Sequence, residues 1–162
     1  MLRELRVQNL KSFAGEHSAP LAPLTLIYGP NSGGKSTLLQ ALLFAAQTAD
    51  AGHLMIQPKF QGARADLGNF HLAVHGHDLA RVIKLGFNWG SPEEPRRLDV
   101  GWGAVVDGER VTPVLDRWEA SHTKSSTGPG ALVAQANASE LPEQPQAMSE
   151  TVSVALSSAG GE

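Results

Sequence analysis

The chain has 162 residues, a formal net charge of −3 and no cysteine. This length is enough for one domain whose core needs no metal or disulfide. The small net charge provides no global field that would attract nucleic acid or a membrane, and the lack of thiols excludes disulfides, cysteine nucleophiles and cysteine zinc sites.

The amino terminus, MLRELRVQNLKSF, alternates charged with apolar residues and lacks the unbroken apolar core of a signal peptide. The most apolar run, residues 38–46, is about half the length that a helix needs to cross a bilayer. We therefore expect a soluble, cytoplasmic protein that does not associate with membranes.

The first predicted element is a strand with Leu2, Leu5 and Val7 on one side, followed by a turn over residues 9–13. After a proline-containing connection, residues 24–28 (LTLIY) form a short apolar run with β-branched and aromatic members, which predicts a buried parallel strand. Residues 36–47 are good helix formers with apolar side chains nearly all round, which predicts a buried helix.

Residues 51–68 show no clear period, so we expect a loop that contains at most a short helix. Residues 81–89 alternate like a half-buried strand. Two more strands, 96–106 and 109–118, are joined at Asp107-Gly108, a dipeptide typical of tight hairpins, which predicts an antiparallel meander. The chain then divides into a folded unit over residues 1–120 and a flexible, low-complexity tail over residues 121–162, because the tail has few large apolar residues.

The stretch GPNSGGKST fits the phosphate-binding pattern G-x-x-x-x-G-K-[ST] with Gly29, Gly34, Lys35 and Ser36. Glycines let successive backbone amides converge on a polyphosphate, and a following helix adds its positive amino-terminal end. Lys35 is expected to reach the β and γ phosphates, the Ser36 hydroxyl to ligate Mg²⁺, and Thr37 to bond the α phosphate. ATP and Mg²⁺ are therefore the expected cofactors.

Together, the opening NLKSF and the loop GPNSGGKSTLLQALLF resemble the amino-terminal lobe of ABC-type ATPases of the SMC, RecF and OLD group. The segment FQGARADLGNFHLAVHGHD and the loop order N-S-G-G-K are most similar to the OLD-like branch. The resemblance implies the α/β class: a P-loop NTPase lobe with a mixed sheet around a buried P-loop helix, beside the meander.

The resemblance also implies a site and partners. The residues expected to bind the nucleotide are Gly29, Pro30, Asn31, Ser32, Gly33, Gly34, Lys35, Ser36, Thr37, Lys11 and Ser12, with Ser36 also at the metal. Such heads close on ATP as homodimers or with a second lobe, and they act in DNA repair or phage defence. DNA is a partner by family analogy only.

Hydrolysis in this group needs an apolar strand that ends in an aspartate and a glutamate. Asp107 and Glu109 are separated by a glycine and fit a hairpin better, and Asp116 has no acid after it. The sequence LSSAGGE, residues 156–162, resembles the serine-glycine signature that opens a helix in this group, but no helix is expected to follow it, so we regard the match as a coincidence. We therefore assign no catalytic residue, and we expect ATP turnover only if another chain or a longer reading frame supplies the missing elements.

Two other functions remain open. A small P-loop kinase would need a lid rich in arginines, for which only Arg81, Arg96 and Arg97 are available. A non-enzymatic module, in which nucleotide binding alone controls assembly, would need no catalytic acids. An ABC transporter subunit is similar too, but it would carry an adenine-stacking aromatic residue well upstream of the loop, and the chain offers only Phe13.

Several other candidates have ordinary explanations. The cluster His71, His75, His77 and Asp78 has ligand types that suit zinc, although solvent-facing histidines around a turn explain it better. Gln61 lies where the group carries a glutamine that senses Mg²⁺ and γ phosphate, but a glutamine before glycine is more typical of a turn.

The remaining candidates are an arginine pair and three tryptophans. Arg96 and Arg97 could contact nucleic-acid phosphates, although the neighbouring acids favour a solvated face of mixed charge. The tryptophans, expected in the core or on a sheet face, are Trp89, Trp102 and Trp118.

Overall fold

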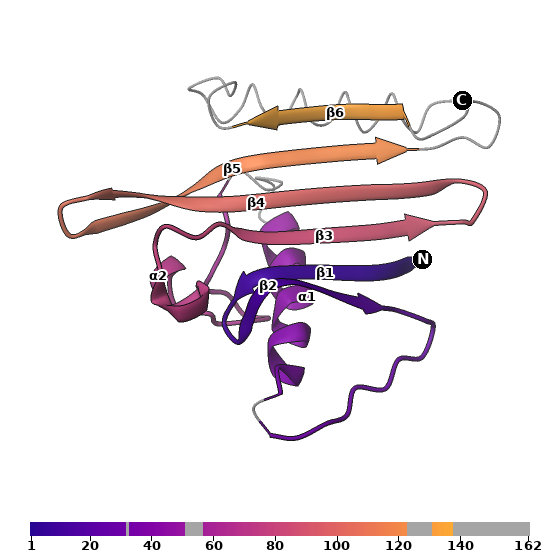
Figure 1. Cartoon of the computed structure of the whole chain (residues 1–162), viewed down its shortest axis with the longest axis horizontal. Coiled ribbons are helices and arrows are strands. Elements are labelled where there is room, and N and C mark those ends of the chain that lie inside the picture. The colour runs from indigo at the N-terminus through magenta and orange to yellow at the C-terminus, as the bar shows by residue number, and fades with distance from the viewer. Residues whose placement is uncertain (32, 51–56, 123–130, 138–162) are drawn as a thin grey trace.

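The fold is one antiparallel sheet with a long helix packed across one face, as a computed structural model of the chain shows (Figure 1). The structure describes residues 1–31, 33–50, 57–122 and 131–137. The elements are β1 (Leu2–Leu10), β2 (Phe13–Pro20), α1 (Lys35–Asp50), α2 (Phe70–Ala73), the 3₁₀ turn η1 (His75–His77), β3 (Ile83–Gly90), β4 (Pro95–Asp107), β5 (Arg110–His122) and β6 (Ala131–Asn137).

The strand order is β2-β1-β3-β4-β5-β6, and every neighbouring pair is antiparallel. The meander predicted for residues 81–118 is confirmed as β3, β4 and β5. The predicted hairpin is confirmed too: Asp107 pairs with Arg110, and Gly108 has φ 57°. A positive φ at the first central residue is the requirement of a type II′ turn, which glycine meets without strain.

The parallel strand predicted for residues 24–28 is wrong for the described part of the chain, and with it the mixed sheet. This segment lies outside the sheet, on the connection that leads from β2 round to the start of α1 (Figure 1). Leu24 is 77% exposed and Tyr28 is 92% exposed. A strand forms only where a neighbouring strand accepts and donates its backbone hydrogen bonds, and no described strand pairs with these residues.

The P-loop helix is amphipathic rather than buried all round, which corrects the prediction for residues 36–47. Ala41 and Phe44 are fully buried, whereas Leu39 and Leu43 are 52% and 41% exposed. The ring of Phe44 stacks on Phe60 at 5.0 Å between centroids and meets Trp102 edge-on at 5.4 Å. These aromatic contacts fix the helix on the sheet. Leu38 and Leu42 pack against the same core, whereas Leu39 and Leu43 face away from it.

The core lies between α1 and the sheet. Leu5 and Val7 from β1 and Ile83 and Leu85 from β3 are at most 1% exposed, as the alternation in the sequence predicted. Of the three tryptophans, Trp102 and Trp118 are buried in this core and Trp89 is partly buried.

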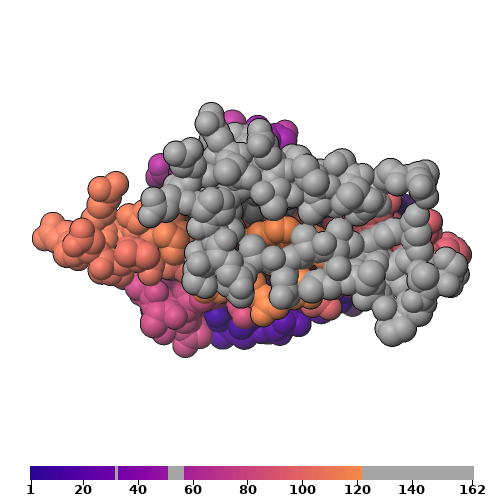
Figure 2. Space-filling view, turned by 90° about the horizontal axis from the view of Figure 1, so that it is seen from above, coloured from indigo at the N-terminus to yellow at the C-terminus, as the bar shows by residue number. Residues whose placement is uncertain are grey.

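The segment predicted as a flexible tail contains regular structure. β5 continues to His122, and β6 pairs with it in the register Ala120 to Ala134. The other tail residues lie outside the described part of the chain. At the other end of β5 from His122, the β4–β5 hairpin projects from the molecule (Figure 2). Val105 and Val106 near the tip of this hairpin are more than half exposed.

Candidate nucleotide-binding site

The glycine loop leads directly into the longest helix of the described structure. α1 begins at Lys35, and the amide of Leu38 donates to the Gly34 carbonyl at 3.0 Å, which places Gly34 at the helix cap. Gly34 has φ 81°, and a Cβ there would lie 2.9 Å from Cζ of Phe13. Both the backbone conformation and the available space therefore require glycine at this position.

The start of α1 is suited to an anion. The amides of Lys35, Ser36 and Thr37 have no carbonyl acceptor within the helix, as at the start of any helix, and no acidic residue lies in the first turn. The partial positive charge at this end is therefore not neutralised by the chain's own side chains. This donor set fits the polyphosphate of a nucleotide.

The Lys35 side chain closes the loop on itself. Its Nζ donates to the Gly29 carbonyl at 2.8 Å and to the Pro30 carbonyl at 2.6 Å, and the amide of Gly33 also donates to the Pro30 carbonyl at 3.2 Å. A nucleotide phosphate would have to replace these carbonyl contacts of the ammonium. Lys35 is thus held inside the loop rather than extended into solvent.

The other predicted site residues fall into two groups. Asn31 and Ser36 are exposed, which leaves the Ser36 hydroxyl accessible to a hard cation. Thr37, in contrast, is 7% exposed, and its Oγ1 lies 3.1 Å from Ser12 Oγ. Its hydroxyl is therefore engaged inside the protein. Ser32 lies outside the described residues.

The turn between β1 and β2 carries Lys11 and Ser12 to the loop. Ser12 contacts Thr37, and the Phe13 ring lies against Gly34, so the turn touches both the loop and the first turn of α1. From the sequence, Phe13 was considered only as a residue that could stack on adenine. Its contact with Gly34 was not predicted, because the only local hint is its position directly after Lys11 and Ser12. The structure thus brings Ser12 and Phe13 beside the glycine loop, with Lys11 next to them in the same turn.

Gln61 lies at the wrong end of α1 for a phosphate sensor. A Cβ on the neighbouring Gly62 would lie 2.9 Å from Cδ of Gln47, and Gln61 pairs in an isolated bridge with Asp66. Gln47 is twelve residues after Lys35, which corresponds to about 18 Å along the helix. The turn interpretation of Gln61 therefore fits the geometry.

The histidine cluster does not converge on one point. His75 Nδ1 lies 2.7 Å from the Lys11 carbonyl, whereas the rings of His71 and His77 contact each other at 5.0 Å between centroids. Among the described residues, no three metal-binding side chains are close enough to hold an ion. Asp78 has a lowered pKa because the Ala80 amide donates to its carboxylate and Arg81 adds a hydrogen bond and a charge.

The acids considered for hydrolysis lie elsewhere. Asp107 closes the β4–β5 turn, and Glu109 is inside that turn. Asp116 lies near Gly101, since its Oδ2 would be 3.7 Å from a Cβ built there. The signature-like segment LSSAGGE, residues 156–162, lies outside the described part of the chain.

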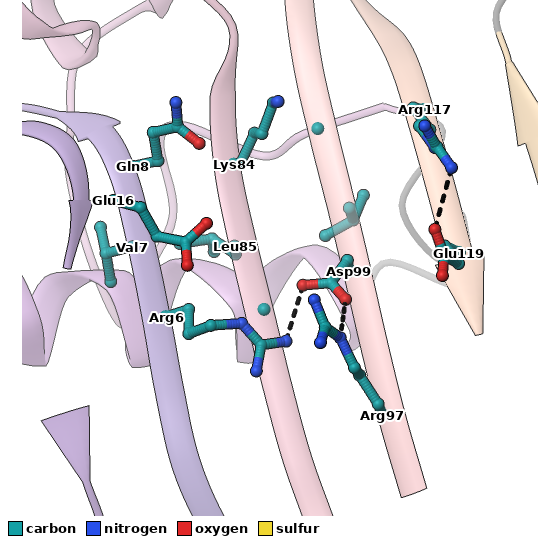
Figure 3. Close-up of a pocket in the computed structure, with 13 residues that line it drawn as sticks. Arg6, Val7, Gln8, Glu16, Lys84, Leu85, Arg97, Asp99, Arg117 and Glu119 are labelled. Atoms are coloured by element: carbon teal, nitrogen blue, oxygen red, sulfur yellow. Dashed lines mark hydrogen bonds and ion pairs between the residues drawn. The ribbon is translucent and has the colours of Figure 1, made fainter. Parts of the chain in front are cut away.

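A hollow of about 200 Å³ lies on the sheet face opposite α1 (Figure 3). Five of its charged groups form ion pairs: Arg6 and Arg97 both bond Asp99, and Arg117 bonds Glu119 at 2.9 Å. The hydrogen bond to Asp99 raises the pKa of Arg97, and the nearby carboxylates add to this effect. This pairing fits the mixed-charge face expected around Arg96 and Arg97.

Comparison with known proteins identifies the lobe. Residues 4–91, more than half of the chain, match the AAA domain family. The chain belongs to this family. It is 47% identical over 45 residues to the chromosome partition protein Smc of a Synechococcus strain. The match covers 27% of this chain and 4% of that protein. The AAA domain and the similarity to Smc agree with the resemblance to the amino-terminal lobe of SMC-like ATPases that was read from the sequence.

No helix in the described part of this AAA domain is long and apolar enough to cross a membrane.

Proposed function

We propose that this lobe binds ATP with Mg²⁺ between the glycine loop and the start of α1, as one part of a larger cytoplasmic ATPase head. The observation that carries the proposal is the junction at Gly34 and Lys35, where a positive-φ glycine leads into a sixteen-residue helix with no acid in its first turn. Lys35 would neutralise the β and γ phosphates, and Ser36 would supply a hydroxyl to Mg²⁺. Bound ATP would then be positioned by Gly29 to Thr37, with Lys11 and Ser12 alongside.

The head needs a further part to hydrolyse ATP. Apolar side chains of residues 24–28 are exposed, and Leu39 and Leu43 are exposed on the adjacent helix. Such a surface suits strands from another segment or chain that would pair with residues 24–28 and bring paired acids. A homodimer that closes on ATP is the related arrangement. The N-S-G-G-K loop favours an OLD-like branch, with a role in DNA repair or phage defence.

Nucleotide binding is tested by calorimetry with ATP and Mg²⁺ on the full chain and on Lys35→Ala. We expect the variant to bind about 10- to 100-fold more weakly, because a charge-assisted contact to phosphate is lost. Lys84→Ala, which removes a lysine from the opposite sheet face, is the matched control and should bind as well as the wild type. Equal affinity of the wild type and Lys35→Ala would refute the proposal.

A non-enzymatic module is the second candidate, because none of the described acids that were considered for hydrolysis lies at the loop. Phosphate release separates the two functions. The ATPase proposal expects release only when the missing lobe is added, with DNA as a possible activator. The module expects nucleotide-dependent assembly, visible by sedimentation, without release under either condition.

A further inference from the structure

The glycine loop is braced by the β1–β2 turn. Ser12 Oγ lies 3.1 Å from Thr37 Oγ1, and the Phe13 ring occupies the space where any side chain on Gly34 would project. Thr37 is 7% exposed, so this contact is largely shielded from water. A displacement of the turn would therefore remove support from the cap and the first turn of α1 together.

The turn and the end of β1 that leads into it have an unfavourable backbone. Lys11 has φ 48° and Asn9 has φ 56°, a left-handed conformation that non-glycine residues adopt only when their surroundings hold them there. The Asn9 side chain is one such support, because its Nδ2 donates to the Val82 carbonyl at 2.9 Å and its Oδ1 accepts from the Gly15 amide at 3.3 Å.

The second support comes from residues 73–75, more than sixty positions along the chain. The Lys11 amide donates to the Ala73 carbonyl at 2.7 Å, and Leu10 and Val74 form a β-bridge. His75 completes this support: its Nδ1 lies 2.7 Å from the Lys11 carbonyl. Because a carbonyl only accepts, Nδ1 must carry the proton in this contact. Both backbone groups of Lys11 are thus held by one short segment.

We propose that His75 is a positioning residue for nucleotide binding, which it supports by fixing the Lys11–Ser12 turn against Thr37 and Gly34. The proposal rests on the nucleotide binding proposed above. His75 contacts neither the glycine loop nor α1 through any hydrogen bond of the described structure; its effect passes through the Lys11 carbonyl. His71 and His77, which contact each other, have no such link to the turn.

Three variants of the full chain test this role. His75→Ala removes the donor, and His75→Asn places an amide donor near the position of Nδ1. His71→Ala is the matched control, since its ring contacts only His77 among the aromatic side chains of the described residues. The measurements are calorimetry with ATP and Mg²⁺, thermal unfolding, and amide hydrogen exchange at Lys11 and in residues 33–38.

We expect His75→Ala to bind ATP about fivefold more weakly, the effect of losing one hydrogen bond, while His75→Asn and His71→Ala bind like the wild type. In the absence of nucleotide, the Lys11 amide should exchange about fivefold faster in His75→Ala alone, with core amides such as that of Leu85 unchanged.

Two results would overturn the proposal. One is unchanged Lys11 exchange and affinity in His75→Ala; the other is faster exchange throughout the core with a lower melting temperature, which would mark a purely structural role. If the wild type itself binds no ATP, the proposed function fails, and the exchange rates at Lys11 and residues 33–38 still decide whether His75 holds the turn.

Discussion

Arg6 and Asp99 form an ion pair that passes over an intervening strand. Arg6 Nη2 lies 2.7 Å from Asp99 Oδ1, although β3 separates β1 from β4. The register places Arg6 beside Gly86 and Gly86 beside Asp99, so the pair crosses directly above the glycine. Only a residue without a side chain leaves room for this contact, and the Arg6 side chain is just 11% exposed.

The first prediction is that Gly86→Ala destabilises the fold by about 1–2 kcal/mol. A Cβ there would lie 2.6 Å from Arg6 Nη2 and would also collide with Asp99, so these side-chain ends must shift and the geometry of the ion pair is disturbed. Urea unfolding followed by fluorescence of the buried tryptophans measures the change.

Gly103→Ala is the control for Gly86→Ala, because a Cβ on Gly103 would meet only Val82, at 3.9 Å. Its unfolding free energy should be within about 0.5 kcal/mol of the wild type, or slightly higher, since alanine has less freedom to lose on folding. If both substitutions had the same effect, the ion pair above Gly86 would not be the cause.

Local sequence patterns predicted those elements whose partners are close in sequence. The meander follows from alternation in β3 and from the Asp107-Gly108 turn, and the helix start follows from the glycine loop. β2 was missed because FAGEHSAP has few apolar residues: among the described strands this edge strand pairs only with β1, and it is mostly exposed. Residues 24–28 failed for the opposite reason, since β-forming residues do not specify whether a partner strand is present.

The candidate site was predictable in its chemistry but not in its supports. The motif identified Gly29, Gly34, Lys35 and Ser36 because phosphate binding needs those residue types at that spacing. His75 was considered only as a metal ligand, since its contact with Lys11 spans 64 positions and leaves no periodic signal. Contacts of this kind depend on tertiary packing.

The second prediction concerns the pH dependence of Asp78. Its pKa is lowered below 3.8 chiefly by the Ala80 amide, and Arg81 contributes a further hydrogen bond at 3.0 Å. A pKa that is lower in the folded state adds stability above the unfolded value, and this stability is lost as the pH falls through the folded value. The unfolding free energies of wild type and Asp78→Asn should therefore converge in strong acid.

Carboxyl NMR titration checks the cause of the Asp78 shift. In Arg81→Gln, the midpoint of Asp78 should rise but stay below 3.8, because the larger contribution of the Ala80 amide remains. An unchanged midpoint would show that Arg81 has no part in it, and a midpoint at or above 3.8 in the wild type would contradict the assignment to Ala80.

The third prediction concerns Gln47, a buried polar residue on the apolar face of α1. Its Nε2 donates to the Lys59 carbonyl at 2.6 Å and to the Ala65 carbonyl at 3.0 Å, and its Oε1 accepts from the Ala65 amide at 3.0 Å. Gln47→Leu leaves the Lys59 carbonyl and the Ala65 amide without these partners, while the Ala65 carbonyl keeps the Gly62 amide, and should lower the unfolding free energy by about 2–4 kcal/mol. Gln40→Leu, on a partly exposed position of the same helix, should change it by less than about 0.5 kcal/mol. Hydrogen exchange of the Ala65 amide locates the effect, and this exchange should become faster in Gln47→Leu but not in Gln40→Leu. Equal exchange in the two variants would mean that the loop over residues 59–65 is held by its own turn rather than by the helix.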